Sequence, residues 1–151
     1  MFWVYEMEYT GNPVADPGIE LIPFRDSFYP QYERIYNECF FDMRKALNIE
    51  PYDFYSDISQ LQAKKENIFL LVENDIIIGS IGCFGCEIDD LIVNKEYQRR
   101  GYGALLLNWA VSHIRELSHE PITLHAAEWN QSAVKLYLKN GFVIKKKERI
   151  G

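Results

Sequence analysis

The stretch QRRGYG, residues 98–103, stands between an apolar, strand-like run and the helical sequence ALLLNWAVSHIREL at 104–117. Gly101 and Gly103 have no Cβ, so the backbone can turn tightly there and expose its N–H groups. The apolar residues that follow recur with the i, i+3, i+4, i+7 spacing of a helix with one buried face. A helix N-terminus offers free N–H donors and the positive end of the helix dipole, which suit a phosphate group. We therefore predict that this turn, with its two arginines, binds a pyrophosphate.

Known phosphate-binding glycine motifs differ from this one. A Walker loop requires a Lys-[Ser/Thr] pair after its last glycine, and no such pair follows Gly103. A dinucleotide-binding fingerprint requires a third glycine where this chain has Leu106. Taken alone, the turn is also compatible with an ordinary strand–turn–helix connection that has a solvated basic tip.

A second stretch, WNQSAVKLYLKNGF at residues 129–142, follows the first after about thirty residues. Together the two stretches resemble the GNAT superfamily of N-acetyltransferases. The signature of that superfamily is Gln/Arg-x-x-Gly-x-Gly/Ala, followed later by Asn-x-x-Ala-x-x-x-Tyr and then Gly-Phe. The matching positions here are Gln98, Gly101, Gly103, Asn130, Ala133, Tyr137, Gly141 and Phe142. The resemblance extends over roughly residues 19 to 148, almost the whole chain.

This resemblance implies an α/β fold of the mixed α+β kind, the acyl-CoA N-acyltransferase fold, in which helices flank a mixed central sheet on both faces. At 151 residues the chain is expected to form a single domain, 1–151. Periodicity and turn residues predict the individual elements. Strands are expected at 19–24, 68–73, 76–83, 87–93, 122–126 and 142–148, and helices at 29–47, 53–65, 131–140 and after the glycine turn.

The C-terminal end departs from the family pattern. The family usually has two strands after Gly-Phe, whereas only one fits before Gly151. Meanwhile FWVYEMEY at residues 2–9 has the β-branched and aromatic content of a strand. We hypothesise that the N-terminal segment, 1–18, supplies the missing strand. It would pair either within its own chain or with a second subunit of a homodimer, because an unpaired sheet edge invites association.

The resemblance implies transfer of an acetyl group from acetyl-CoA to a primary amine, by direct attack through a tetrahedral intermediate. We expect a small-molecule acceptor. A protein N-terminus or lysine is the first alternative, and a non-catalytic acyl-CoA-binding regulatory module is the second. Acetyl-CoA is the expected co-substrate, and no metal is expected because the histidines lack metal-ligand spacing. The residues expected to hold CoA are Ile92, Val93, Gln98, Arg99, Arg100, Gly101, Tyr102, Gly103, Ala104 and Asn130.

Tyr137 is the residue that the family motif implies as a catalytic acid. A phenol placed near the sulfur can protonate the departing CoA thiolate. The alternative is core packing, because Ala133, Leu136 and Tyr137 share one helical face. Asn130 is expected to cap the same helix, in addition to contacting CoA.

The general base is less well defined by the sequence. Glu87 and Asp89 share one strand face by the two-residue period, whereas Asp90 is expected on the other face. Glu87 lies where the histone-acetylating branch of the family has its catalytic glutamate, so we predict Glu87 as the base. Asp89 and a water relay are the alternatives. His125 is a candidate ligand contact on the neighbouring strand.

Charge is distributed unevenly along the chain. Residues 1–93 contain 17 acidic and 6 basic side chains, and residues 94–151 contain 5 acidic and 10 basic ones. The basic part includes the glycine turn, and the acidic part suits a cationic amine. The alternative is that both are ordinary solvated faces. A pI near 5.1 argues against nucleic acid as a partner.

The remaining composition indicates a cytoplasmic chain with no membrane partner. No apolar run approaches the length needed to cross a bilayer, and the N-terminus lacks the features of a signal peptide. Three cysteines, an odd count, favour reduced thiols. Cys83 and Cys86 flank a predicted hairpin turn at Phe84-Gly85 and are not expected to form a redox or zinc motif.

Overall fold

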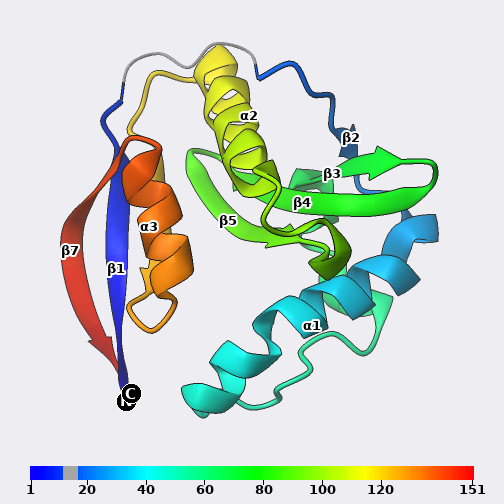
Figure 1. Ribbon diagram of the computed structural model, residues 1–151, viewed down its shortest axis with the longest axis horizontal. Helices are drawn as coiled ribbons and strands as arrows, with labels where there is room; N and C mark the ends of the chain where they lie inside the picture. Colours follow the sequence, from blue (N-terminus) through cyan, green and yellow to red (C-terminus); the bar gives the residue numbers. More distant parts are fainter. Residues whose placement is uncertain (12–16) are drawn as a thin grey trace.

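The fold is organised around one mixed β-sheet. The computed structural model describes residues 1–11 and 17–151, and within them seven strands lie in the order β2-β3-β4-β5-β6-β1-β7 (Figure 1). The strands are β1 (Phe2–Tyr9), β2 (Ile22–Pro23), β3 (Ile68–Glu73), β4 (Ile76–Phe84), β5 (Glu87–Val93), β6 (Thr123–Ala127) and β7 (Phe142–Ile150). The helices are α1 (Tyr29–Ala46), α2 (Tyr102–Leu117) and α3 (Gln131–Lys139). Neighbouring strands are antiparallel except β5 and β6, which are parallel.

Most elements lie where the sequence predicts them, so the acyl-CoA N-acyltransferase fold is confirmed. α1 has a proline in its first turn, where the missing N–H breaks no helical bond. β3 and β4 form a hairpin in which Asn74 and Asp75 have φ values of 53° and 62°. Two consecutive positive φ values are typical of the tight turn that matches strand twist.

Two expected elements differ in the structure. The prediction of a helix at 53–65 is wrong. The structure has only two short 3-10 helices there, η2 (Ile58–Leu61) and η3 (Lys65–Asn67), the second of which begins at the end of the segment. The side chain of Asn37 donates to the Tyr55 carbonyl at 2.9 Å and accepts from the Tyr55 N–H at 3.0 Å, which keeps Tyr55 out of a helical ladder. The strand expected at 19–24 is reduced to β2, because Pro23 has no N–H with which to continue the pairing.

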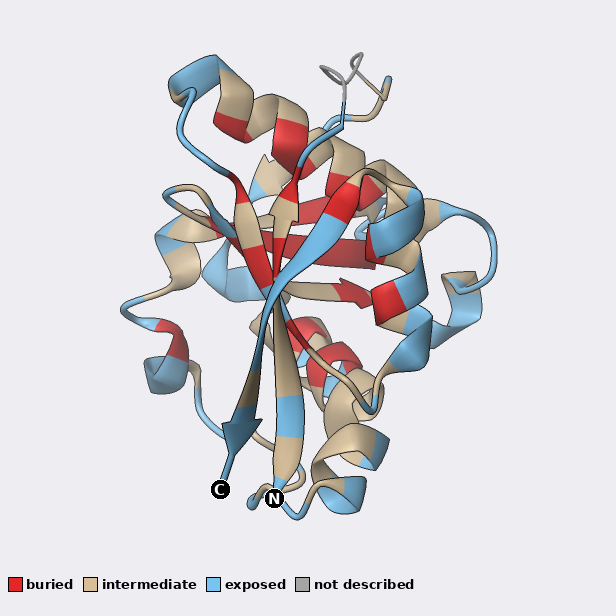
Figure 2. Ribbon diagram, turned by 90° about the vertical axis from the view of Figure 1, so that its left-hand side faces the viewer, coloured by how far each residue is buried: buried red, intermediate tan, exposed pale blue. Residues whose placement is uncertain are grey.

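β1 occupies an interior position in the sheet. It pairs with β6 from Val4↔Ala127 onward and with β7 from Phe2↔Ile150 onward. Of the N-terminal segment, β1 therefore completes the sheet of its own chain. The two chain ends lie side by side (Figures 1 and 2), and a Cβ built on Gly151 would be 3.2 Å from the Met1 Cα.

Two apolar cores lie on opposite faces of the sheet. α2 and α3 cover one face with residues such as Leu107, Val111 and Val134. α1 and the connection that follows it cover the other face, where Tyr32 and Tyr55 are almost fully buried. Buried segments are concentrated where these helices meet the strands, whereas β7 is exposed along most of its length (Figure 2).

The three cysteines are free thiols. Phe84 is the last residue of β4 and pairs with Glu87, so the β4–β5 turn consists of Gly85 and Cys86, one residue later than expected. No helix in residues 1–11 and 17–151 combines the length and the hydropathy that a bilayer crossing requires.

Candidate active site

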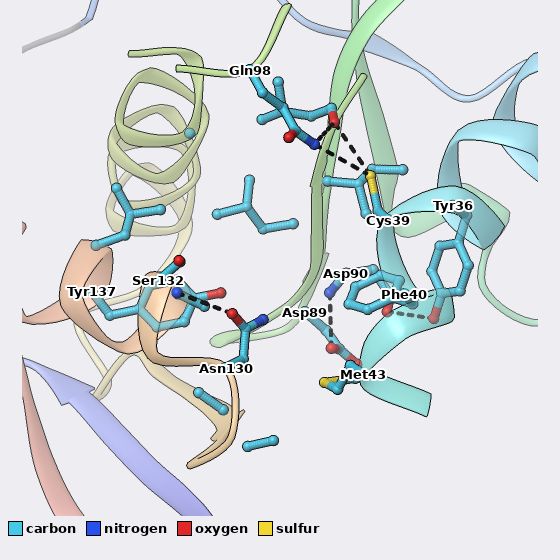
Figure 3. A pocket seen from close by; sticks show the side chains of 18 of the residues that line it. Tyr36, Cys39, Phe40, Met43, Asp89, Asp90, Gln98, Asn130, Ser132 and Tyr137 are labelled. Atoms are coloured by element: carbon cyan, nitrogen blue, oxygen red, sulfur yellow. Dashed lines mark hydrogen bonds between the residues drawn. The ribbon is translucent and has the colours of Figure 1, made fainter. Parts of the chain in front are cut away.

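The candidate site is a cleft that opens where β5 and β6 diverge. The two parallel strands pair at Glu87↔Thr123 and Ile88↔Leu124, and they separate from Asp89 onward. A cavity of about 690 Å³ lies in the gap. Its walls are the later part of β5, the end of β6, the glycine turn, one face of α1, and α3 (Figure 3).

The glycine turn lies in this cleft and begins α2. Arg99 and Gly101 have φ values of 64° and 86°, and Gly101 is the N-cap of the helix. The first intrahelical hydrogen bond runs from the Leu105 N–H to the Gly101 carbonyl at 3.3 Å, so the N–H groups up to Ala104 precede the helical ladder. Left-handed residues next to a helix start direct successive N–H groups into an anion-binding concavity. The turn therefore fits a pyrophosphate.

Eight of the ten residues expected to hold CoA line the cleft. They are Ile92, Val93, Gln98, Arg99, Gly101, Tyr102, Gly103 and Asn130. The Arg100 guanidinium instead lies over the Tyr97 ring, 5.4 Å from its centroid. Ala104 is not among the lining residues, and its N–H lies in the first turn of α2, before the helical ladder begins. A Cβ on Gly103 would lie 3.2 Å from the Leu136 Cδ2, so the small residue permits close approach of α2 to α3.

The Val93 carbonyl connects β5 to the glycine turn and to α1. Gln98 Nε2 donates to it at 2.9 Å, and the Cys39 thiol donates at 3.3 Å. A strand residue directs its N–H and its carbonyl to the same edge of the strand. Because the Val93 carbonyl points away from β4, the Val93 N–H also faces the cleft.

A β-bulge in β5 brings two carboxylates to one side of the strand. Between the pairs Gly82↔Asp89 and Ser80↔Ile92, β5 has one residue more than β4. Asp90 has a φ of 53°, and a bulge of this kind removes a residue from the usual alternation. Both Asp89 and Asp90 line the cleft. The expectation that they face opposite sides is therefore wrong, and the sequence signal for the bulge is the adjacent acid pair between the apolar residues of the strand.

Asp90 is a buried carboxylate with incomplete hydrogen bonding. Its side chain is 9% exposed, and its Oδ1 accepts a hydrogen bond from the Tyr36 hydroxyl at 3.2 Å. Its Oδ2 lies 3.9 Å from the Lys64 Nζ and accepts no hydrogen bond from the described residues. Burial raises the pKa of Asp90 to about 6, with the Asp89 charge adding to the rise and Lys64 opposing it. Asp90 can therefore exchange a proton near neutral pH.

Tyr137 lies on α3, across the cleft from Asp89 and Asp90 (Figure 3). The side chain is 9% exposed, and its ring centroid is 6.1 Å from that of Phe142, so packing against the core is part of its role. Burial raises the pKa of Tyr137 to about 12, and the two aspartates add to the rise. The phenol is thus protonated at neutral pH, and its hydroxyl donates no hydrogen bond to residues 1–11 or 17–151.

Asn130 caps α3 as the sequence predicts. Its Oδ1 accepts a hydrogen bond from the Ala133 N–H at 3.3 Å. The same residue lines the cleft, so the contact with CoA stays a prediction that is compatible with the capping role.

Glu87 lies at the start of β5, outside the residues that line the cleft. Its Oε1 is 3.2 Å from the Nδ1 of His125, whose Nε2 is 3.6 Å from a carboxylate oxygen of Glu6. His125 itself lines the cleft. The structure thus brings Tyr137, Asn130, His125 and the glycine turn into one cavity but does not place Glu87 there.

One face of α1 forms a wall of the cleft, and sequence reasoning assigned none of its individual residues to the site. Tyr36, Phe40, Met43 and Arg44 line the cleft with the spacing i, i+4, i+7, i+8. The periodicity identified the helix but not the ligand-facing part of its apolar stripe. The hydroxyl of Tyr36 and the cation of Arg44 within that stripe were the available signal.

Comparison with known proteins agrees with this geometry. The model of the acetyltransferase (GNAT) family matches residues 29–142. Comparison with curated proteins gives no match. An acetyltransferase from the GNAT family of Colwellia psychrerythraea is 11% identical with a TM-score of 0.70, over 95% of this chain and 53% of that chain.

Two further solved structures share the fold. A GCN5-related N-acetyltransferase from Sphaerobacter thermophilus is 19% identical with a TM-score of 0.64, over 97% of this chain and 49% of that one. The PaiA N-acetyltransferase from Thermoplasma acidophilum, solved with coenzyme A, is 19% identical with a TM-score of 0.63, over 85% of this chain and 91% of that one. This chain thus spans about half the length of the first two proteins and most of the third.

Proposed function

Because this chain belongs to the acetyltransferase (GNAT) family, we propose that it transfers an acetyl group from acetyl-CoA to a primary amine of a small molecule. One observation carries the proposal: a buried carboxylate and a neutral phenol line the same cleft as a helix N-terminus built for phosphate. The carboxylate is Asp90 and the phenol is Tyr137.

The glycine turn supports the binding of CoA. Its N–H groups, the left-handed backbone at Arg99 and Gly101, and the close approach at Gly103 together suit the pyrophosphate. Acetyl-CoA would supply an activated acyl group there. The Val93 N–H, which faces the cleft, would stabilise negative charge on the thioester oxygen.

Asp90 supports the removal of a proton from the acceptor. An ammonium group must lose a proton before its nitrogen can attack a carbonyl carbon. Asp90 lines the cleft and has a pKa of about 6, so its carboxylate can accept that proton at neutral pH. We therefore propose Asp90, in place of Glu87, as the general base.

Tyr137 supports the departure of the thiolate. When the bond between the carbonyl carbon and sulfur breaks, the sulfur takes the electron pair and requires a proton. The Tyr137 phenol holds its proton at neutral pH and faces the cleft from the wall opposite the two aspartates. After each turnover, Tyr137 regains its proton from solvent.

The experiment that tests the proposal measures two quantities on the same purified protein. Calorimetry with CoA tests binding, and the release of free thiol from acetyl-CoA over a panel of primary amines tests catalysis. We expect binding together with thiol release that depends on the amine. Binding without turnover on any amine or peptide would indicate the non-catalytic regulatory alternative, and turnover on peptides alone would indicate a protein acetyltransferase. Absence of binding by the folded protein would overturn the proposal.

A further inference from the structure

We infer that the acceptor carries a carboxylate in addition to its amine, and that Arg44 binds this carboxylate while the aspartates of β5 bind the amine. The inference rests on the proposed function and specifies the substrate class of the same cleft. It depends on the position of Arg44, on what holds its guanidinium, and on the charges around it.

Arg44 and Tyr36 lie on the same cleft-facing side of α1, and Tyr36 contacts the proposed base, Asp90. Tyr36 donates its hydroxyl hydrogen to Asp90, and Arg44 follows it two turns later on the same face of α1. Phe40 and Met43 line the cleft between them. Eight residues of helix span roughly 12 Å. Arg44 and Asp90 line the same cleft across this span.

The guanidinium is held in place but is not neutralised. One N–H of Arg44 donates to the Pro51 carbonyl at 3.0 Å, and the guanidinium carbon lies 4.7 Å from the Phe54 ring centroid. Within residues 1–11 and 17–151, no carboxylate lies within 4 Å of Arg44, and the Pro51 contact is its one hydrogen bond. An arginine has five donors in a planar fork that matches a carboxylate. Most of that fork is therefore available to a ligand.

The charges around the cleft favour a zwitterion over a polycation. Asp89 and Asp90 line the cleft and provide an anionic site for an ammonium group. Arg44 lines the same cleft, and its charge lowers the pKa of Asp90 against the effect of burial, so it lies within electrostatic range of that site. A second ammonium on the acceptor would be repelled by Arg44, whereas a carboxylate would be attracted.

The wall between the two charged ends is apolar. Phe40, Met43 and Ile49 line the cleft and are partly exposed to it. We therefore expect an acceptor with an amine, an apolar body and a carboxylate, which is the chemistry of an apolar amino acid. The same feature argues against a peptide N-terminus, in which the carboxylate is replaced by an amide.

Matched sets of acceptors test the inference directly. One set is leucine, leucinamide and isopentylamine. The other set has a terminal amine and consists of 6-aminohexanoate, 6-aminohexanamide and hexylamine. Each set keeps the amine and the apolar body and changes only the group that would meet Arg44. The longer set also keeps the basicity of the amine nearly constant. For the wild-type protein we expect kcat/KM for the carboxylate member of at least one set to exceed that of its amide by about tenfold or more.

Variants then attribute the preference to one side chain. Arg44→Gln should reduce the preference for the carboxylate over the amide to within about twofold, and Arg44→Lys should retain part of it, because a lysine keeps the charge but loses the fork. Arg34→Gln is the matched control, since Arg34 lies on α1, pairs with Glu38 at 3.7 Å and does not line the cleft. It should leave the preference unchanged.

Failure of this inference differs from failure of the proposed function. If the amides or the simple amines are acetylated as well as the carboxylates, acetyl transfer stands and the assignment of Arg44 is overturned. The same conclusion follows if Arg44→Gln retains the full preference. If CoA binds and no acceptor of any kind is acetylated, the proposed function itself fails.

Discussion

Asp90 and Tyr137 show how the cleft sets the chemistry of single side chains. Burial is the main cause of the pKa shift in both, and it raises both values. The consequences differ because the two groups start from different values. The pKa of the Asp90 carboxyl moves toward neutral pH, where the group can act as a base. The pKa of the Tyr137 phenol moves further above neutral pH, so the phenol keeps its proton but gives it up less readily.

Replacement of Tyr137 by phenylalanine removes the donor and keeps the packing against Phe142. We expect kcat to fall by about 10²-fold or more, because a positioned acid typically contributes that much. The dissociation constant of CoA, measured by calorimetry, should change by less than about threefold. A variant with full kcat would assign Tyr137 to packing alone.

Replacement of Asp90 by asparagine separates its catalytic role from its effect on stability. In the wild type, kcat/KM should rise as the pH increases through about 6, the pKa of Asp90, because only the carboxylate accepts a proton. In Asp90→Asn this step in the pH profile should be lost, and the activity at pH 7.5 should be lower by about 10²-fold. Retention of the step would assign it to another group.

The same variant should be more stable than the wild type at neutral pH. The folded-state pKa of Asp90 is raised from 3.8 to about 6, so the stability that this group contributes is present below pH 3.8 and is lost as the pH rises through 6. Two pKa units correspond to at most about 3 kcal/mol. The stability of Asp90→Asn relative to wild type, from urea unfolding, should therefore increase between pH 4 and pH 7.5. A relative stability that is constant or falls would contradict the buried, raised carboxyl.

At the scale of secondary-structure elements, the sequence identifies elements more reliably than their irregularities. The glycine turn, α3 and its cap follow from local spacing, and they were predictable from residues 98–103 and 130–141 alone. The bulge that redirects Asp90 depends on the pairing of β5 with β4, which local spacing does not contain. The absence of a helix at 53–65 depends on Asn37, a residue of a different element.

The start of α2 is the element whose role in CoA binding is easiest to test. Gly103→Glu places a side chain and a negative charge at the helix N-terminus, where the displaced contact is the flexible end of Leu136. We expect CoA affinity to weaken by at least about tenfold. The new carboxylate would compete with the pyrophosphate for the free N–H groups and the positive end of the dipole, and would repel it.

A charge-matched variant on the same helix provides the control. Ser112→Glu adds the same charge away from the cleft, and it should leave the dissociation constant of CoA within about twofold. Both variants should unfold cooperatively in thermal denaturation. Equal CoA affinity in Gly103→Glu and wild type would rule out this turn as the phosphate site.

At the scale of the whole molecule, β1 joins two strands that follow it in sequence and do not pair with each other. It lies between β6 and β7, and its residues Met7 and Tyr9 are buried in the core beneath α2 and α3. The strand content of residues 2–9 was evident from the sequence, but its partners were not, because pairing over more than one hundred residues leaves no local pattern. The proposed acceptor specificity depends in the same way on distant residues that meet only in the folded chain.

A rearranged chain tests whether the position of β1 in the sheet matters more than its position in the sequence. β1 and β7 are antiparallel, and Gly151 lies against Met1, so a short glycine-serine linker can join them as a hairpin. A chain that begins at Gly18, continues through Gly151 and the linker, and ends at Gly11 should fold with a Tm within about 5 °C of wild type, because nearby termini tolerate permutation. Its affinity for CoA should be unchanged.

A chain that begins at Gly18 and lacks residues 1–11 altogether should show no cooperative unfolding, since β6 and β7 lose their common partner and the core is exposed. If this shortened chain were as stable as the wild type, β1 would be an addition to a sheet that is already complete. If instead both chains failed to unfold cooperatively, the fold would require the connection between Gly11 and Gly18 and not only the strand.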